Sequence, residues 1–289
     1  MVDEDEPRPL RVGTVPYLVG RPLNLGLEDE PGLAVTADVP ARLVEGLRAG
    51  DLDVALVSSI ELFRRPGYRW LPGLCVAGEG FVGSVQLFLR RPLAELRRVA
   101  LDPASRTARA LVQVLAGLDP TMAPDLEFVE VRAGEDPRAA EDCEGWLRIG
   151  DPALLEHLGE GLPHVNPSAR WRELTGLPFV FAAWIARPGV DLAPHREAFE
   201  RAARRGHAAA AGLAREAAVG WGLDPDAVVH YLTEECRFRL DPERQRAALL
   251  AFGARARAAG LVPAEGVPEP GPAWDDGPPP GGPQAPRDH

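Results

Sequence analysis

Short apolar runs alternate with amphipathic segments along the first part of the chain, a pattern typical of strands followed by helices. The run Asp53-Val54-Ala55-Leu56-Val57 is continuous and bounded by turn residues, which predicts a buried strand. Pro40 stands at a favourable first-turn position and predicts a helix through Arg48 that ends at Gly50. Other strands are expected at residues 10–15, 33–39, 73–77 and 81–90. Such βαβ alternation gives a mostly parallel sheet covered by helices.

Two breaks divide the chain into two lobes. Arg91-Pro92 ends the first α/β unit, and Arg187-Pro188-Gly189 ends a second one with expected strands at 97–101, 126–131, 146–149 and 178–186. We expect a discontinuous α/β architecture, with residues 1–90 plus 188–262 in the first lobe and residues 91–187 in the second. A ligand would lie in the cleft between the lobes, at the C-terminal ends of the parallel strands.

The C-terminal third changes character. From Asp191 to about Gly260 the chain is rich in Ala and Arg and predicts three helical segments, the last of them capped by Asp241 before Pro242. Within the last segment, an apolar stripe at helical spacing consists of Leu249, Phe252 and Ala256. We expect this stripe to pack in the core rather than to form a recognition surface. From Pro263 onward, 9 prolines and 5 glycines in 27 residues leave little apolar surface to bury. We therefore expect residues 263–289 to be a disordered tail.

Composition excludes several classes of function. The net charge of -11 argues against binding to nucleic acid or to an anionic membrane. The three cysteines form no CxxC and the six histidines no HxxxH or HExxH, so neither a disulfide framework nor a metal site is expected. Residues 1–9 lack an apolar signal core, and the longest apolar stretch, Leu177–Ala186, is too short to span a bilayer. A cytoplasmic protein with reduced thiols is expected.

Small hydroxyl residues recur where strands run into helices. Ser58 and Ser59 follow the strand 53–57, Ser105-Arg106-Thr107 follows the strand 97–101, and Gly83-Ser84 lies within the apolar run 81–89. Helix N-termini carry unsatisfied N–H groups and a partial positive charge, so two such ends facing each other would hold a ligand with two carboxylates. The alternative is that each hydroxyl only caps its helix.

Three further side chains are candidates for the cleft. Arg106 has the geometry to pair with a carboxylate through two hydrogen bonds, although a first-turn Arg can equally be solvated. Tyr17 follows the first strand and would either line the cleft or pack in the core. Asp151, which precedes Pro152, is a candidate base or substrate contact, and its alternative role is an N-cap. Trp184 is expected in the core or at the second crossing.

Five strings in this order resemble the chorismate dehydratase family of the futalosine route to menaquinone. The strings are Arg11-Val12-Gly13-Thr14-Val15-Pro16-Tyr17-Leu18 with Pro22-Leu23, DVALVSSIE at 53–61, Gly83-Ser84-Val85, Ser105-Arg106-Thr107 and TGLPFVFAAW at 175–184. The last of them also separates the dehydratase from its relative, the dihydroxynaphthoate synthase. The resemblance covers roughly residues 10–260. It implies a two-lobed type II periplasmic-binding-protein-like fold, used in the cytoplasm as an enzyme without a cofactor.

The resemblance also implies an activity and a catalytic residue. The family's reaction is that of a hydro-lyase, which removes water from chorismate to give 3-[(1-carboxyvinyl)oxy]benzoate. Ser84 matches the family's active-site serine. One position departs from the family, because Val19 stands where members usually carry Asn. The strings offer no His and no Glu pair, so the hypothesis is that the substrate's enolpyruvyl carboxylate acts as internal base while Ser84 holds the ring or the leaving hydroxyl.

Two alternatives stay open at this point. One is a non-catalytic protein of the same fold that binds a small carboxylate, and the other is the related dihydroxynaphthoate synthase. Loss of chorismate with formation of an aromatic product would support the dehydratase, whereas tight binding of unchanged chorismate would support the binding protein. The sequence leaves the oligomeric state open, and a homodimer is compatible with it.

Overall fold

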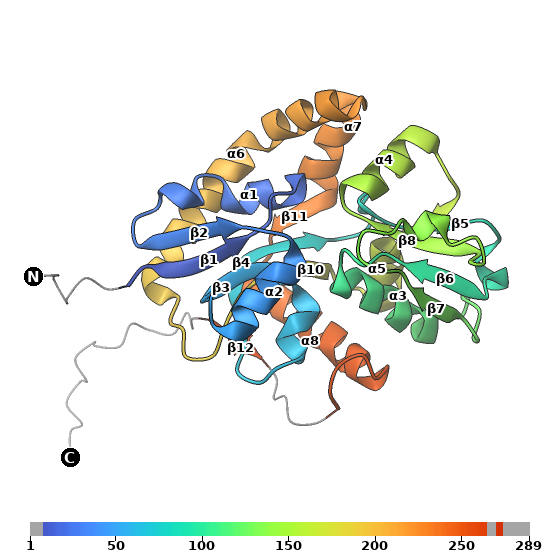
Figure 1. Ribbon diagram of the computed structural model, residues 1–289, viewed down its shortest axis with the longest axis horizontal. Coiled ribbons are helices and arrows are strands. Elements are labelled where there is room, and N and C mark those ends of the chain that lie inside the picture. Colours follow the sequence, from blue (N-terminus) through green and yellow to red (C-terminus); the bar gives the residue numbers. More distant parts are fainter. Residues whose placement is uncertain (1–7, 265–269, 274–289) are drawn as a thin grey trace, which may run out of the picture.

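Two β-sheets, each with its own helices, form the body of the protein in a computed structural model that describes residues 8–264 and 270–273 (Figure 1). The first sheet is seven-stranded, in the order β11-β4-β10-β3-β1-β2 with β12 beside β4, and the second is five-stranded, in the order β7-β6-β8-β5-β9. The strands of the first sheet are β1 (Leu10–Thr14), β2 (Leu33–Ala37), β3 (Val54–Ser58), β4 (Arg69–Gly78), β10 (Phe179–Ala186), β11 (Cys236–Arg239) and β12 (Gly271–Pro272). Those of the second are β5 (Val85–Leu89), β6 (Arg98–Leu101), β7 (Glu127–Glu130), β8 (Gly145–Ile149) and β9 (His164–Val165).

Each sheet contains the parallel βαβ core that the alternating pattern predicts. β1 pairs in parallel with β2 and β3, and β6 pairs in parallel with β7 and β8. The crossover helices begin where Pro40 and Ser105 predict, as Pro at the first helical position and an N-cap serine. The α-helices are α1 (Arg21–Asn24), α2 (Pro40–Ala49), α3 (Arg106–Leu118), α4 (Asp151–Glu160), α5 (Pro167–Thr175), α6 (Arg196–Trp221), α7 (Pro225–His230) and α8 (Pro242–Ala258).

The chain crosses between the lobes earlier than expected at both places. β5 pairs with β8 and β9 in the second sheet, and β10 pairs with β3 and β4 in the first. The crossings therefore lie between Gly78 and Val85 and between Thr175 and Phe179, not near residues 91 and 187. The proline breaks mark the far ends of β5 and β10, because a proline ends a strand without deciding which sheet that strand joins. Gly83 and Ser84 accordingly lie in the first crossing segment rather than inside a strand.

The C-terminal helices α6 and α8 pack on elements of the first lobe. α6 lies against α1 so closely that a Cβ at Gly206 would come within 2.6 Å of the Pro22 backbone. α8 packs on β4 and β10, and its predicted stripe of Leu249, Phe252 and Ala256 is fully buried. Asp241 caps α8 by accepting the Arg244 N–H at 3.0 Å. The middle of the expected helical region differs, since α7 is followed by a π-helical turn (Tyr231–Glu235) and by β11.

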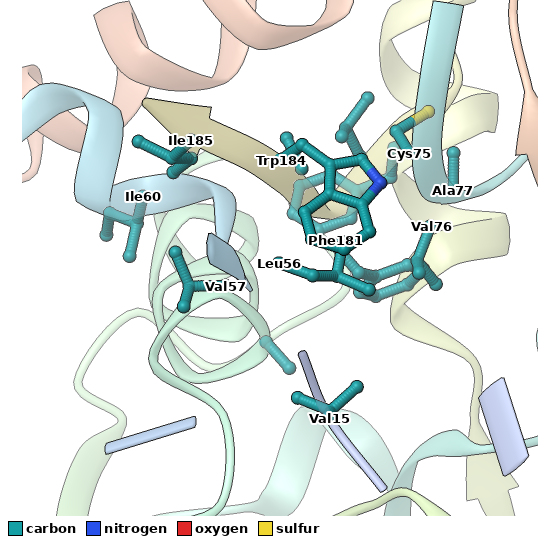
Figure 2. Packing of buried hydrophobic residues seen from close by; sticks show 14 of the residues in the cluster. Val15, Leu56, Val57, Ile60, Cys75, Val76, Ala77, Phe181, Trp184 and Ile185 are labelled. Atoms are coloured by element: carbon teal, nitrogen blue, oxygen red, sulfur yellow. The ribbon is translucent and has the colours of Figure 1, made fainter. Parts of the chain in front are cut away.

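Large apolar side chains fill the core around β3, β4 and β10. Trp184 is fully buried there and packs edge-to-face on Phe199 of α6, with ring centroids 5.0 Å apart, which confirms it as a core residue. Figure 2 shows Leu56, Val76 and Phe181 gathered below the Trp184 indole. These neighbours come from three adjacent strands, β3, β4 and β10, so the core runs across the middle of the first sheet.

Part of the C-terminal tail is ordered against the first sheet. Gly271 and Pro272 pair in parallel with Arg69 and Trp70 of β4, and the Ala273 N–H donates to the Trp70 carbonyl at 2.6 Å. The expectation of a disordered tail is therefore wrong for residues 270–273, because β4 accepts the short strand Gly271–Pro272 beside it although one of its two residues is a proline. The rest of that expectation, at 265–269 and 274–289, falls outside the described residues. Within residues 8–264 and 270–273, no helix combines the length and apolarity needed to cross a bilayer.

Candidate active site

A cavity of about 610 Å³ lies between the two lobes. Its walls include the C-terminal ends of β1 and β3 from the first lobe and of β6 and β8 from the second, where parallel α/β sheets commonly bind ligands. This is the cleft expected from the strand pattern. Most of the surface is apolar and is supplied by Val15, Val19, Val39, Leu56, Val57, Val76, Val82, Val85, Ile149 and Phe181.

The N-terminal ends of three helices contribute to the cavity wall. Val39–Ala41 belong to the start of α2, Ser105 to the start of α3, and Gly150–Pro152 to the start of α4. The Ser105 side chain caps its own helix by accepting the Ala108 N–H at 3.3 Å. The remaining first-turn N–H groups and the helix dipoles make both lobes attractive to negative charge. The expectation that opposite lobes each present helix ends to one ligand fits this arrangement.

Arg148 is the cationic side chain that lines the cavity among the described residues, and it is not among the residues predicted for the site. It lies in β8, with its Nη1 atom 2.9 Å from Asp136 and its Nε atom 2.8 Å from Glu156. Its position near the C-terminal end of a parallel strand, two residues before Gly150, is the signal that would have pointed to it. The two acidic partners fix the guanidinium and neutralise part of its charge.

Two aspartates with raised pKa values face the cavity. Asp102 uses both oxygens to hold backbone, accepting the Ala104 N–H at 2.8 Å and the Ile149 N–H at 3.1 Å, and burial raises its pKa. Burial also raises the pKa of Asp151, whose carboxylate has no hydrogen-bond partner within the described part of the chain. Asp102 therefore shapes the site, while Asp151 is left free to meet a ligand.

Tyr17 and Val19 form part of the cavity wall that the first lobe supplies. Burial and the charges of Asp151 and Asp38 raise the pKa of Tyr17, so the phenol stays protonated where it lines the cavity. Val19 lines the cavity at the position where the resembling family carries Asn. The side chain at this position thus borders the ligand space directly.

Ser84 lies where the two lobes join, and its side chain lines the cavity. Its hydroxyl accepts a hydrogen bond from Tyr231 at 2.9 Å, and its carbonyl accepts the Gly150 N–H at 2.8 Å. The neighbouring Gly83 does not line the cavity, and its N–H donates to the Glu235 carboxylate at 2.7 Å. Of the expected pair, the structure therefore places the serine in the site and uses the glycine to anchor it.

Three other predicted contacts lie behind the cavity wall. Ser59 is fully buried and donates to the Val180 carbonyl at 2.6 Å. Thr107 is also fully buried and accepts the Ile60 N–H at 3.1 Å. Arg106 points toward Glu61, at 3.9 Å.

These side chains join the lobes, since Ser59 and Glu61 belong to the first lobe while Arg106 and Thr107 begin α3 of the second. Of the predicted substrate-binding residues, the cavity is lined by Tyr17, Ser58, Ser105 and Asp151. A serine or threonine at the end of a strand can either face the cleft or form a hydrogen bond between the lobes. Its residue type and position in the sequence do not distinguish these two cases. Among the described residues, no three His, Cys, Asp or Glu side chains gather as a metal site would require.

Comparison with known families shows to which family this chain is related. A family model described as menaquinone biosynthesis matches residues 10–258. The chain belongs to this family. It is 34% identical over 270 residues to the chorismate dehydratase of Thermus thermophilus, which covers 85% of this chain and 94% of that protein. The resemblance carried by the five strings is thereby confirmed.

Solved structures agree on the fold. A protein of Archaeoglobus fulgidus superposes with a TM-score of 0.67 at 19% identity, over 88% of this chain and 99% of that one. A Candida albicans protein described as having the generic periplasmic-binding-protein fold superposes with a TM-score of 0.60 at 11% identity, over 93% and 99%. The family member described here therefore has the two-lobed periplasmic-binding-protein-like fold that was expected.

Proposed function

We propose that the protein is a chorismate dehydratase, a lyase that converts chorismate into 3-[(1-carboxyvinyl)oxy]benzoate and water. The observation that carries the proposal is the cavity itself, an apolar chamber with helix N-termini at its wall in both lobes. Chorismate is a dianion with an apolar ring between its two carboxylates. The 34% identity to the Thermus thermophilus chorismate dehydratase supports the same substrate.

Different parts of the cavity wall suit the charged groups and the hydrocarbon ring of the substrate. Backbone N–H groups at the starts of α2, α3 and α4, together with Arg148, supply positive potential for the carboxylates. The valine and leucine side chains of the wall supply apolar contact for the ring. The local potential draws in an anion although the whole chain carries a net charge of -11.

The reaction requires a proton acceptor and assistance for the departing hydroxyl. A ring C–H bond breaks and its proton passes to a carboxylate. The C–O bond to the ring hydroxyl breaks as well, and the departing oxygen takes up that proton from the carboxylate and leaves as water. The electron pair of the C–H bond completes the aromatic ring, so no oxidant, reductant or cofactor enters the balance. Ser84 donates a hydrogen bond to the leaving oxygen, where negative charge develops in the transition state.

Two carboxylates are candidates for the proton acceptor. One is the substrate's own enolpyruvyl carboxylate, held next to the ring by the closed cavity. The other is Asp151, an unpartnered carboxylate whose raised pKa brings it closer to neutrality than an exposed aspartate. Replacing Asp151 with Asn separates them, because an internal base predicts a kcat within about tenfold of wild type, whereas a protein base predicts a loss of roughly 100-fold or more.

Incubation of the purified protein with chorismate tests the proposed function. We expect chorismate to disappear with formation of one equivalent of an aromatic product lighter by one water, measured by liquid chromatography and mass spectrometry. The same rate after dialysis against a chelator would support a reaction without a metal. Unchanged chorismate would contradict the proposal. The presence of Val19 at the ligand wall, in place of the family's Asn, makes a non-catalytic carboxylate-binding protein the second candidate, and tight binding without turnover would support it.

A further inference from the structure

Behind the cavity wall, a buried tyrosine touches the hydroxyl of Ser84. Tyr231 is almost completely enclosed and does not line the cavity, yet its O–H group donates to Ser84 Oγ at 2.9 Å. It opens the π-helical turn Tyr231–Glu235, and π-helical turns are frequent at functional sites. The residue comes from the C-terminal part of the chain, 147 positions away from Ser84.

The π-helical turn Tyr231–Glu235 forms hydrogen bonds to two consecutive residues of the first crossing segment. Tyr231, at its start, holds the Ser84 side chain, and Glu235, at its end, accepts the Gly83 N–H at 2.7 Å. On the other side, the Ser84 carbonyl accepts the Gly150 N–H at the start of α4. Ser84 is therefore fixed from both lobes, by its side chain to the first and by its backbone to the second.

The hydrogen bonds of the Ser84 hydroxyl leave its own proton available to the ligand. A serine hydroxyl has one proton to donate and accepts through its lone pairs. Because Tyr231 donates to Ser84 Oγ, the Ser84 proton must point elsewhere, and no other hydrogen bond of this hydroxyl is found among the described residues. The side chain lines the cavity, so the free direction opens toward the ligand space. Accepting one hydrogen bond also polarises a hydroxyl and strengthens the bond that it donates.

We propose that Tyr231 is a positioning residue, which orients and polarises the Ser84 hydroxyl as a donor to the ligand's departing oxygen. The inference rests on the proposed dehydratase function. Burial holds the pKa of Tyr231 well above its ordinary value, so the phenol keeps its proton and remains the donor over the whole range of ordinary assay pH. Tyr231 lies outside the cavity wall and acts on the ligand through Ser84.

A double-mutant cycle tests this role, with kcat, KM and the melting midpoint measured for wild type, Tyr231→Phe, Ser84→Ala and the double variant. We expect Tyr231→Phe to lower kcat about tenfold, equal to about 1.4 kcal/mol, with KM within about twofold of wild type. In the Ser84→Ala background the same change should have no further effect on kcat, because the hydroxyl on which Tyr231 acts is gone.

Tyr68→Phe is the matched control, since Tyr68 is equally buried but lies outside the cavity wall and holds no cavity residue. All assays are run well below the lowest melting midpoint of the set, so that every variant is folded. A kcat of Tyr231→Phe equal to that of Tyr68→Phe, or additive losses in the double variant, would overturn the positioning role while wild-type turnover still supported the proposed function. Wild-type protein that forms no aromatic product would overturn both.

Discussion

At Ser84, one side chain faces both the ligand space and the protein interior. Replacing it with Ala removes the donor to the leaving oxygen, and we expect kcat to fall by roughly 100-fold, as for the loss of one positioned donor in other enzymes. The fold should remain, because the lost partner, the Tyr231 hydroxyl, is a single neutral group, with an expected cost of about 1–3 kcal/mol.

Steady-state kinetics and thermal melts measure both effects. Ser168→Ala is the matched control, since Ser168 is fully buried, its hydroxyl has no hydrogen-bond partner among the residues that the structure describes, and it lies outside the cavity wall. Turnover by folded Ser84→Ala as fast as that of the control would remove Ser84 from the mechanism.

Val19 tests whether the cavity accepts a polar side chain at this position. Because the wall around it is built from other valines, an Asn there must shed water without a protein partner when the ligand binds. We expect Val19→Asn to lower kcat/KM by up to roughly tenfold with little change in the melting midpoint, since the position is only half-buried. Val19→Thr, which keeps the shape, serves as control. A rise in kcat/KM would instead indicate that the Asn contact still fits this cavity.

At the scale of the element, the start of α3 serves to join the lobes. Thr107 accepts the Ile60 N–H in a fully buried position, so Thr107→Val leaves that N–H without a partner. We expect the free energy of unfolding to fall by about 1–3 kcal/mol. This differs from the expectation of a direct carboxylate contact, which would raise KM and leave stability unchanged.

Denaturant titration and steady-state kinetics on Thr107→Val and on Thr107→Ser, which keeps the hydroxyl, distinguish these roles. If Thr107→Val is as stable as wild type and its KM is raised, Thr107 contacts the ligand directly and the role at the lobe junction is wrong.

At the scale of the whole molecule, Asp53 ties three strands of the first sheet together. Its buried carboxylate accepts hydrogen bonds from Arg11 of β1 at 2.9 and 3.0 Å and from Arg187, just after β10, at 2.8 and 3.1 Å. These partners outweigh the effect of burial and hold the pKa of Asp53 far below its ordinary value. The carboxylate therefore stabilises the fold above the unfolded-state pKa of about 3.9, and this contribution is lost as the pH falls toward the folded-state value.

We expect the wild-type free energy of unfolding to decline more steeply below about pH 4 than that of Asp53→Asn, which should be less stable at pH 7 by roughly 1–3 kcal/mol. Urea titrations at a series of pH values measure both slopes. Asp51→Asn, which changes an exposed carboxylate beside it, is the control. Parallel slopes for Asp53→Asn and wild type would show that Asp53 does not govern acid stability.

The sequence by itself determined the local structure and the family. Apolar runs and Pro-marked starts placed β3 and α2 within one or two residues, because strand burial and first-turn preferences act over neighbouring positions. The order of the motifs identified the family and, through it, the two-lobed fold.

Tertiary structure decided what depends on partners distant in the chain. Both crossings between the lobes lie elsewhere than predicted. The sheet that a strand joins is set by its hydrogen bonds to other strands and not by a proline after it. Packing placed Thr107 at the lobe junction and Tyr231 behind Ser84, and no local pattern around either residue indicates these positions. Arg148 had a local signal in its strand-end position, but its place in the cavity wall depends on the assembled lobes. A side chain's neighbours across 48 or 147 positions are fixed only when the lobes assemble, and those neighbours decide whether a hydroxyl binds ligand or holds the protein together.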